Sequence, residues 1–275
     1  MTRAPSRRPR QHTPPDELWA RLRELTAARI GLKRSGASLA TAPLLEFKLA
    51  HARARDAVLE PLDETRLIAE LAGLSDPVLS VASAAADRRK YLLRPDLGRC
   101  LAANAQAVLA PHAGGQDVVF VIADGLCARA VKMHAREVLA RIIEALRAKG
   151  WSIAPLVVAR HGRVAIGDAI ATTLRAACVA ILIGERPGLS AADSMSVYLT
   201  WQPHAHTTDA ERNCVSNIRP EGIGCAEAAG KIAYLLLAMR TRGMSGVQLK
   251  DDSDIRCSEI SCQVSGIRPQ MIPDT

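Results

Sequence analysis

Aromatic residues are scarce in this 275-residue sequence, of which they make up 3%. Nucleic-acid-binding surfaces stack bases on aromatic side chains, so this scarcity argues against a nucleic-acid partner. The sequence also lacks any run near the ~20 apolar residues that a membrane-spanning helix needs. Its N-terminus has no apolar segment long enough for a secretory signal. We therefore expect a globular, cytoplasmic protein with neither a membrane nor a nucleic-acid partner.

The sequence has seven cysteines, an odd number, and no two of them have Cys-x-x-Cys spacing. They are scattered through apolar segments, which is untypical of a disulfide scaffold and favours reduced thiols. Without such a pair, a structural zinc ribbon is disfavoured as well. The sequence also lacks both GxGxxG and Walker A motifs. A ligand site built on a standard phosphate-binding loop is therefore disfavoured.

Positive charge is concentrated near the N-terminus. Residues 1–55 hold 12 Lys or Arg against 4 Asp or Glu, whereas the rest of the chain holds equal numbers of each sign. Such a basic segment can bind nucleic acid, a membrane surface or an acidic protein. Residues 1–15 combine four arginines with several prolines and have no apolar periodicity. This composition predicts a flexible basic tail over 1–15.

The segment after this tail has the periodicity of helices. Apolar residues recur at helical spacing from Asp16 to Gly31 and again from Thr41 to Val58. These helices carry too little apolar surface to build a core of their own. We therefore expect residues 16–80 to form a helical arm that packs on partner subunits.

From residue 117 the sequence alternates between strand and helix patterns. Three continuous apolar runs predict strands that are buried on both faces: 117–123, 153–159 and 178–183. Helical periodicity marks three further segments: 127–149, 169–175 and 225–241. This order predicts an α/β fold with a Rossmann-like, mostly parallel sheet flanked by helices. We place this domain at 81–250, followed by a polar tail at 251–275 that contains Cys257 and Cys262.

Ligands of a parallel sheet bind beyond the carboxyl ends of its strands, where the crossover loops converge. Three predicted loops lie at that edge: 124–127, 161–164 and 184–189. The stretch from 184 to 222 is also denser in polar, glycine and proline residues than an ordinary connection. We expect it to carry a site or an interface.

Three groups of residues in these regions are candidates for chemistry. Cys127 lies at the start of a predicted helix, where the dipole can lower a thiol pKa, so it is a possible nucleophile with a histidine. We favour the alternative of a small residue packed under the sheet edge. His204 and His206 can ligate a metal, but without a clear third ligand we favour a surface loop. Asp193 and Asp209 can act as acid and base, although capping is usual for carboxylates beside Ser and Thr.

Several ordered motifs between roughly residues 14 and 250 carry a resemblance to a known family. Among them are Tyr91-Leu92-Leu93-Arg94-Pro95-Asp96-Leu97-Gly98-Arg99, Ala123-Asp124-Gly125-Leu126, Gly162-Arg163-Val164, Gly184-Glu185-Arg186-Pro187-Gly188-Leu189 and Ala210-Glu211-Arg212-Asn213-Cys214-Val215-Ser216-Asn217-Ile218. Together they resemble the small (light) subunit of ethanolamine ammonia-lyase, an adenosylcobalamin enzyme. Several motifs in the right order are more specific than any one of them alone.

The resemblance implies a lyase that converts ethanolamine to acetaldehyde and ammonia by radical rearrangement. Homolysis of the cobalt–carbon bond of adenosylcobalamin supplies the radical. In this family a large subunit carries the substrate site and the catalytic side chains, so no catalytic residue and no metal ligand is expected in this chain. The small subunit closes over the lower side of the corrinoid. The cofactor contacts that carry over are Val164, Glu185 and Cys214.

The residue types at these three positions suit that role. Val164 and Cys214 offer dispersion contacts to the apolar dimethylbenzimidazole, and Glu185 can accept hydrogen bonds from the corrinoid amides. The sequence lacks DxHxxG, so we predict that the benzimidazole stays on cobalt in the base-on form. The resemblance also implies that the basic arm contacts neighbouring subunits. In some members this arm directs the enzyme into a bacterial microcompartment.

The sequence departs from the family pattern at three places. His161 stands where an aromatic residue is expected, Gly224-Cys225-Ala226 replaces a proline-rich turn, and 251–275 exceeds the usual C-terminus. Two other functions stay open. One is a non-catalytic assembly subunit that no longer binds the cofactor, and the other is a free-standing α/β enzyme that uses Cys127.

Overall fold

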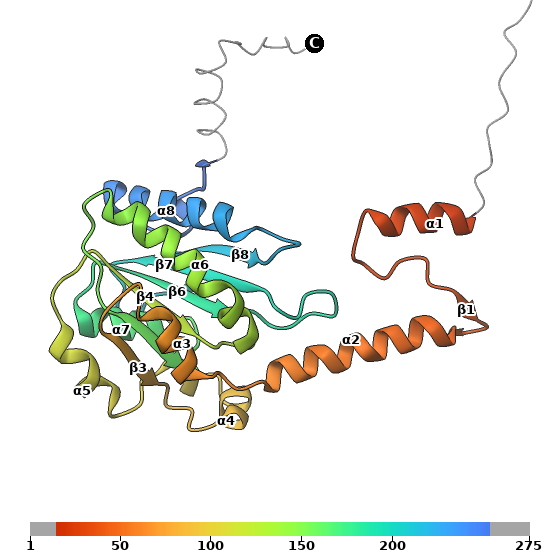
Figure 1. Cartoon of the computed structure of the whole chain (residues 1–275), viewed down its shortest axis with the longest axis horizontal. Coiled ribbons are helices and arrows are strands. Elements are labelled where there is room, and N and C mark those ends of the chain that lie inside the picture. Colours follow the sequence, from red (N-terminus) through yellow and green to blue (C-terminus); the bar gives the residue numbers. More distant parts are fainter. Residues whose placement is uncertain (1–14, 254–275) are drawn as a thin grey trace, which may run out of the picture.

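The three strands expected from continuous apolar runs lie side by side in one six-stranded sheet (Figure 1). In this computed structural model, which describes residues 15–253, they are β4 (Val118–Ala123), β5 (Leu156–Arg160) and β6 (Cys178–Gly184). All residues of β4 and β6 are buried, as such runs predict. β3 (Val78–Ala82) pairs with β5, and the four strands run parallel in the order β3-β5-β4-β6. The expected α/β class with a mostly parallel sheet is confirmed.

Two antiparallel strands complete the sheet, and the sequence analysis did not predict them. β7 (Met195–Trp201) pairs with β6, and β8 (Arg212–Ile218) pairs with β7. Both lie in the stretch 184–222, which was expected to carry a site or an interface. β7 alternates polar and apolar residues, which is the pattern of a strand with two different faces. β3 was not predicted either, and it spans residue 80, the expected end of the arm.

Helices cover both faces of this sheet (Figure 1). They are α6 (Ala128–Arg147) and α8 (Cys225–Arg242) on one face, and α5 (Ala105–Leu109) and α7 (Ile166–Leu174) on the other. α6 and α8 begin and end within two residues of the prediction. α7 begins earlier than expected, so Gly167 and Asp168 lie inside the helix and not before it. Gly167 packs closely on the sheet, since a Cβ there would lie 3.2 Å from Val179 Cγ2.

Among residues 15–253, no helix packs along the second face of β7 and β8 in the way that α6 and α8 pack on the first. On the first face, Val197, Leu199 and Val215 are buried in the same core cluster as α6 and α8. On the second face, Tyr198 is half-buried and Cys214 is exposed. The remaining short elements are α3 (Glu64–Leu71), α4 (Arg88–Leu93), η1 (Leu97–Arg99), η2 (Ala110–His112), η3 (Asp209–Glu211) and η4 (Gly246–Gln248). The sheet therefore offers an exposed surface beside α7.

The N-terminal arm extends away from the sheet (Figure 1). It consists of α1 (Pro15–Glu24), a small hairpin of β1 (Arg34–Ser35) and β2 (Ser38–Leu39), and α2 (Thr41–Leu59). α2 matches the prediction, whereas α1 ends seven residues before Gly31. Large apolar side chains are exposed along the arm, among them Leu18, Trp19, Leu25, Leu45, Phe47 and Leu49. The arm thus presents apolar surface that the rest of residues 15–253 does not cover.

The two predicted tails fall almost wholly outside the described residues. Of 1–15 only Pro15 is described, and of 251–275 only 251–253. Cys257 and Cys262 also lie outside. Among residues 15–253, no helix combines the length and the apolar character that crossing a membrane requires.

Candidate functional site

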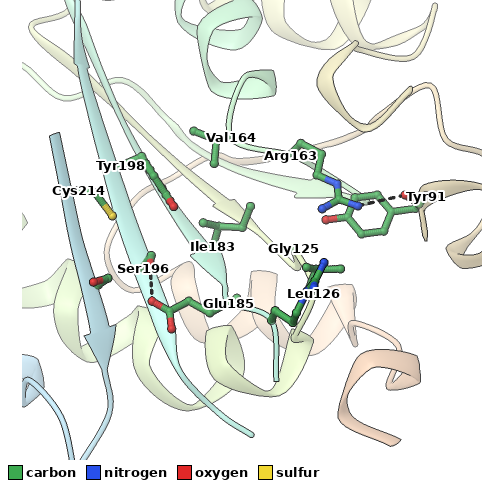
Figure 2. A pocket seen from close by; sticks show the side chains of 13 residues that line it. Tyr91, Gly125, Leu126, Arg163, Val164, Ile183, Glu185, Ser196, Tyr198 and Cys214 are labelled. Atoms are coloured by element: carbon green, nitrogen blue, oxygen red, sulfur yellow. Dashed lines mark hydrogen bonds between the residues drawn. The ribbon is translucent and has the colours of Figure 1, made fainter. Parts of the chain in front are cut away.

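A pocket of about 390 Å³ lies at the carboxyl edge of the parallel strands. We call it the edge pocket. It brings together all three residues that the sequence analysis proposed as cofactor contacts: Val164, Glu185 and Cys214 (Figure 2). The other lining residues are Tyr91, Gly125, Leu126, Arg163, Ile183, Gly184, Arg186, Ser196, Tyr198 and Ser216. Segments that are far apart in the sequence therefore form one cavity at the edge where ligands of such sheets bind.

The open face of β7 and β8 forms one wall of the edge pocket. Side chains alternate between the two faces of a strand. Val197 and Leu199 face the core with α6 and α8, so Ser196 and Tyr198 lie on the opposite face of β7. Tyr198 lies opposite Cys214 in the antiparallel register, which puts both side chains on the pocket face. Figure 2 shows this wall opposite Arg163 and Tyr91, with Val164 and Ile183 between.

Glu185, directly after β6, is held in place by two hydrogen bonds. The Ser196 hydroxyl and the backbone N–H of Asn217 (3.0 Å) both donate to Oε1. Burial raises the pKa of Glu185, but the Asn217 N–H, the Ser194 and Ser196 side chains and the positive charge of Arg219 outweigh it, so the pKa lies below the usual range. Both hydrogen bonds go to Oε1, so Oε2 keeps its capacity to accept. The site therefore contains a fixed, ionised acceptor for N–H groups.

Cys214 and Tyr198 supply a polarisable, uncharged part of the wall. Desolvation of the thiol raises the pKa of Cys214, although the nearby hydroxyls of Tyr198 and Ser196 oppose this. Burial, together with the neighbouring Cys214, raises the pKa of Tyr198 to about 12. Both groups are therefore neutral at pH 7. A neutral thiol beside an aromatic ring suits contact with an apolar ligand group.

Tyr91 and Arg163 form the opposite wall, and Arg88 packs on the Tyr91 ring. Tyr91 is fully buried, and its hydroxyl donates to the Gly162 carbonyl at 3.2 Å. The guanidinium carbon of Arg163 lies 4.3 Å from the centre of the Tyr91 ring, and that of Arg88 lies 4.9 Å from it. Burial raises the pKa of Tyr91 to about 12, so the ring stays neutral beneath the two cations. This packing fixes the loop that carries Val164.

A buried carboxylate supports the floor of the edge pocket. Asp124 follows β4, and its Oδ2 accepts a hydrogen bond from Arg88 Nη1 at 3.3 Å. The same Arg88 atom donates to the Gly125 carbonyl at 2.7 Å. Burial raises the pKa of Asp124 despite the attraction of Arg88. Gly125 has φ +54°, and a Cβ there would overlap the Gly184 carbonyl, so only glycine allows this close approach of two loops.

Cys127 does not line the edge pocket, although its carbonyl lies against Gly184, which does. Its side chain is fully buried, and its thiol donates to the Ala192 carbonyl at 3.1 Å. Burial raises the pKa of Cys127, which opposes the activation expected of a nucleophile at a helix start. Its contacts fit the alternative that we favoured, a small residue packed at the sheet edge.

The histidine and aspartate candidates do not form a site either. His204 and His206 follow β7 in a loop, and His204 Nε2 lies 3.6 Å from a Glu211 carboxylate oxygen. No cluster of three or more His, Cys, Asp or Glu within residues 15–253 is arranged to hold a metal. Asp193 precedes β7 and Asp209 begins η3 before β8, beyond opposite ends of the antiparallel β7–β8 pair, so the fold does not bring them together as an acid–base pair.

Among the pocket residues that were not singled out from the sequence are Tyr91, Arg163, Ser196 and Tyr198. Two of them stand in quoted motifs, but nothing in the sequence placed the segment before β4 at this edge. Ser196 and Tyr198 show period-two alternation with Val197 and Leu199, which predicts a strand and could have identified the wall.

Comparison with known proteins agrees with the motifs. Residues 16–250 match the family model described as "Ethanolamine ammonia-lyase light chain (EutC)". The chain is 52% identical over 246 residues to an ethanolamine ammonia-lyase small subunit of Xanthomonas campestris, covering 88% of this chain and 90% of the relative. Small subunits of Ralstonia nicotianae (49% over 241 residues, 86% and 89%) and Azotobacter vinelandii (48% over 241 residues, 86% and 89%) are also similar. The chain belongs to the ethanolamine ammonia-lyase small-subunit family.

Proposed function

We propose that this chain and a large subunit together form an adenosylcobalamin-dependent ethanolamine ammonia-lyase. In this complex the edge pocket closes over the lower side of the corrinoid, and the large subunit carries the substrate and the catalytic side chains. The observation that carries the proposal is the convergence of Val164, Glu185 and Cys214 on one cavity. The enzyme is expected to act in the cytoplasm, and in a microcompartment where the organism builds one.

The residues of the pocket fit the chemistry of this cofactor. The lower side of a base-on cobalamin has an apolar benzimidazole surrounded by amide side chains. Val164 and the neutral Cys214 thiol offer apolar and polarisable surface, and the ionised Glu185 offers Oε2 to an amide N–H. Adenosylcobalamin, when bound, supplies the radical by homolysis of its cobalt–carbon bond.

This chain's own residues then bind and orient, and none of them acts on substrate. Glu185 stays ionised because of its hydrogen bonds, so its acceptor oxygen is held in one place without taking up a proton. Tyr91 and Arg163 hold the Val164 loop. The wall of β7 and β8 excludes water from one side of the pocket.

Corrinoid affinity of the purified two-subunit complex tests this proposal. We expect Glu185→Gln to weaken cyanocobalamin binding by about tenfold or more, because a charge-assisted hydrogen bond contributes roughly 1.5–3 kcal/mol. Glu144→Gln, an exposed change on α6, is the matched control and leaves the affinity unchanged. Unchanged affinity in Glu185→Gln and in Cys214→Ser would support the non-catalytic assembly subunit instead.

The arm supports the partner part of the proposal. Leu45 and Leu49 of α2 are 59% and 52% exposed, which is unfavourable for an isolated chain and typical of a covered interface. We expect Leu45→Glu/Leu49→Glu to abolish co-purification with the large subunit while the melting temperature of the free chain changes little. Retained co-purification would show that this face of the arm is not part of the interface.

A further inference from the structure

A second pocket, of about 480 Å³, adjoins the edge pocket. We call it the arginine pocket. It shares Arg163, Val164 and Tyr198 with the edge pocket, so the two form a continuous surface. Its other lining residues are Pro95, Arg99, Ala165, Thr207, Thr208, Asp209 and Arg212. A ligand that fills the edge pocket beside Val164 therefore meets the arginine pocket directly.

The arginine pocket has a surplus of positive charge. Arg212 is neutralised, because Nη1 and Nη2 lie 2.7 Å and 2.6 Å from the two carboxylate oxygens of Asp168. The Asp209 carboxylate, which also lines the pocket, lies 3.6 Å from Arg212 Nε. Among the described residues, Arg99 and Arg163 form no ion pair with a carboxylate, and the buried Nε of Arg163 has no hydrogen-bond partner. Two guanidinium groups are thus left to attract an anion.

The position of Arg99 is fixed by the turn that precedes it. The backbone N–H of Arg163 donates to the Gly98 carbonyl at 2.7 Å, which joins η1 to the loop after β5. This approach needs glycine, since a Cβ on Gly98 would lie 2.7 Å from Arg163 Cγ and 3.1 Å from Tyr91 Cε2. The motif from Tyr91 to Arg99 therefore contributes to both pockets. The Tyr91 ring lines the edge pocket, and the Arg99 guanidinium lines the arginine pocket.

We infer that the arginine pocket binds the phosphodiester of the cobalamin nucleotide loop, with Arg99 and Arg163 as its cations. The inference rests on the proposed function. In a base-on cobalamin, a ribose and one singly charged phosphodiester link the benzimidazole to the corrin ring. A chain that packs on the base in one cavity therefore meets this phosphate in a neighbouring one. Arginine suits the role because its planar fork can donate two hydrogen bonds to phosphate oxygens.

Thr207 adds a neutral donor to the same pocket. Its Oγ1 accepts a hydrogen bond from the His204 N–H at 2.8 Å, so the hydroxyl proton is available to a ligand. The Thr208 hydroxyl, by contrast, already donates to Glu211 at 2.7 Å. Specificity follows from this arrangement: the chain distinguishes corrinoids that carry the nucleotide loop from those that lack it.

The test compares two corrinoids on the purified two-subunit complex. The probes are cyanocobalamin, which carries the phosphodiester, and dicyanocobinamide, which lacks the whole nucleotide loop. We expect Arg99→Gln to weaken cyanocobalamin binding by about tenfold and to leave cobinamide binding unchanged. Arg242→Gln, an exposed charge loss at the end of α8 that lines neither pocket, is the control and changes neither affinity.

A second readout does not depend on cobinamide. Raising the NaCl concentration screens the phosphate–arginine attraction, so cyanocobalamin affinity falls more steeply with salt in the wild type than in Arg99→Gln. Equal salt dependence, or equal loss of both corrinoids in Arg99→Gln, overturns the inference while the proposed function stands. Inorganic phosphate that binds the cyanocobalamin-loaded complex through Arg99 overturns it too, since the pocket then serves free phosphate. Failure of the wild-type complex to bind either corrinoid overturns the proposed function as well.

Discussion

Arg212 and Asp168 form a bidentate ion pair that joins the first residue of β8 to the first turn of α7. The two N–O distances are 2.7 Å and 2.6 Å, and the side chains are only 3% and 8% exposed. Arg212 Nη1 also donates to Thr200 Oγ1 at 3.0 Å. This pair connects the antiparallel edge of the sheet to the helix beside both pockets.

Removing one partner of this pair is expected to destabilise the fold strongly. Arg212→Met leaves Asp168 buried without a counter-charge, which costs about 3–5 kcal/mol of unfolding free energy. Replacing both, as Arg212→Met/Asp168→Leu, leaves no unpaired charge and should cost less than the single change. Urea denaturation of the full chain followed by circular dichroism measures both. A single variant within about 1 kcal/mol of the wild type would contradict the structural role of the pair.

Gly184 and Gly188 provide a matched test of loop geometry within one motif. A Cβ at Gly184 would overlap the Cys127 carbonyl, a backbone atom that cannot move without shifting α6. At Gly188 the nearest atom would be the Ala191 carbonyl oxygen at 3.5 Å, an ordinary contact. We expect Gly184→Ala to lower the unfolding free energy by more than about 3 kcal/mol and Gly188→Ala by less than about 1 kcal/mol. Similar melting temperatures for the two variants would show that Gly184, at the carboxyl end of β6, is not tightly packed against the Cys127 carbonyl.

The lowered pKa of Glu185 makes its contribution to stability depend on pH. A carboxyl with a folded-state pKa below its unfolded value stabilises the fold at pH values above the unfolded pKa, near the ordinary 4.5. That stabilisation is lost as the pH falls through the folded-state pKa. The difference in unfolding free energy between wild type and Glu185→Gln should therefore be constant from pH 7 to about pH 5 and shrink below it. A difference that grows towards acid would contradict the assigned direction of the shift.

The thiols should differ in reactivity according to their burial. Cys127 and Cys178 are buried with raised pKa values, whereas Cys214 is exposed at the edge pocket. We expect iodoacetamide to modify Cys214 but neither buried thiol in the folded chain, as mapped by peptide mass spectrometry. Because the pKa of Cys214 is also raised, its rate should still increase between pH 8 and about pH 10. Rapid modification of Cys127 at pH 7 would instead revive its role as a nucleophile.

The sequence predicts the centre of this fold better than its edges. β4 and β6 are buried on both faces, so their continuous apolar runs stand out, and the long faces of α6 and α8 do too. β7 and β8 were missed because each has one polar face, and the polar loops around them dominate the local composition. β3 was missed because its pattern is short and stands apart from the strands it joins.

The site could be predicted in part. Val164 and Glu185 follow predicted strands, so topology alone places them at one edge of the sheet. Cys214 entered only through the family resemblance, because its strand was not predicted. Tyr91 and Arg99 could not be placed, since their position depends on the Gly98–Arg163 contact between segments far apart in the chain.

Acetaldehyde formation from ethanolamine tests the central claim most directly. The chain is co-expressed with its large subunit, purified through a tag on this chain, and assayed with and without adenosylcobalamin. We predict activity that needs both chains and the cofactor. A stable complex that binds the cofactor but forms no acetaldehyde, or turnover by this chain alone, would contradict the account.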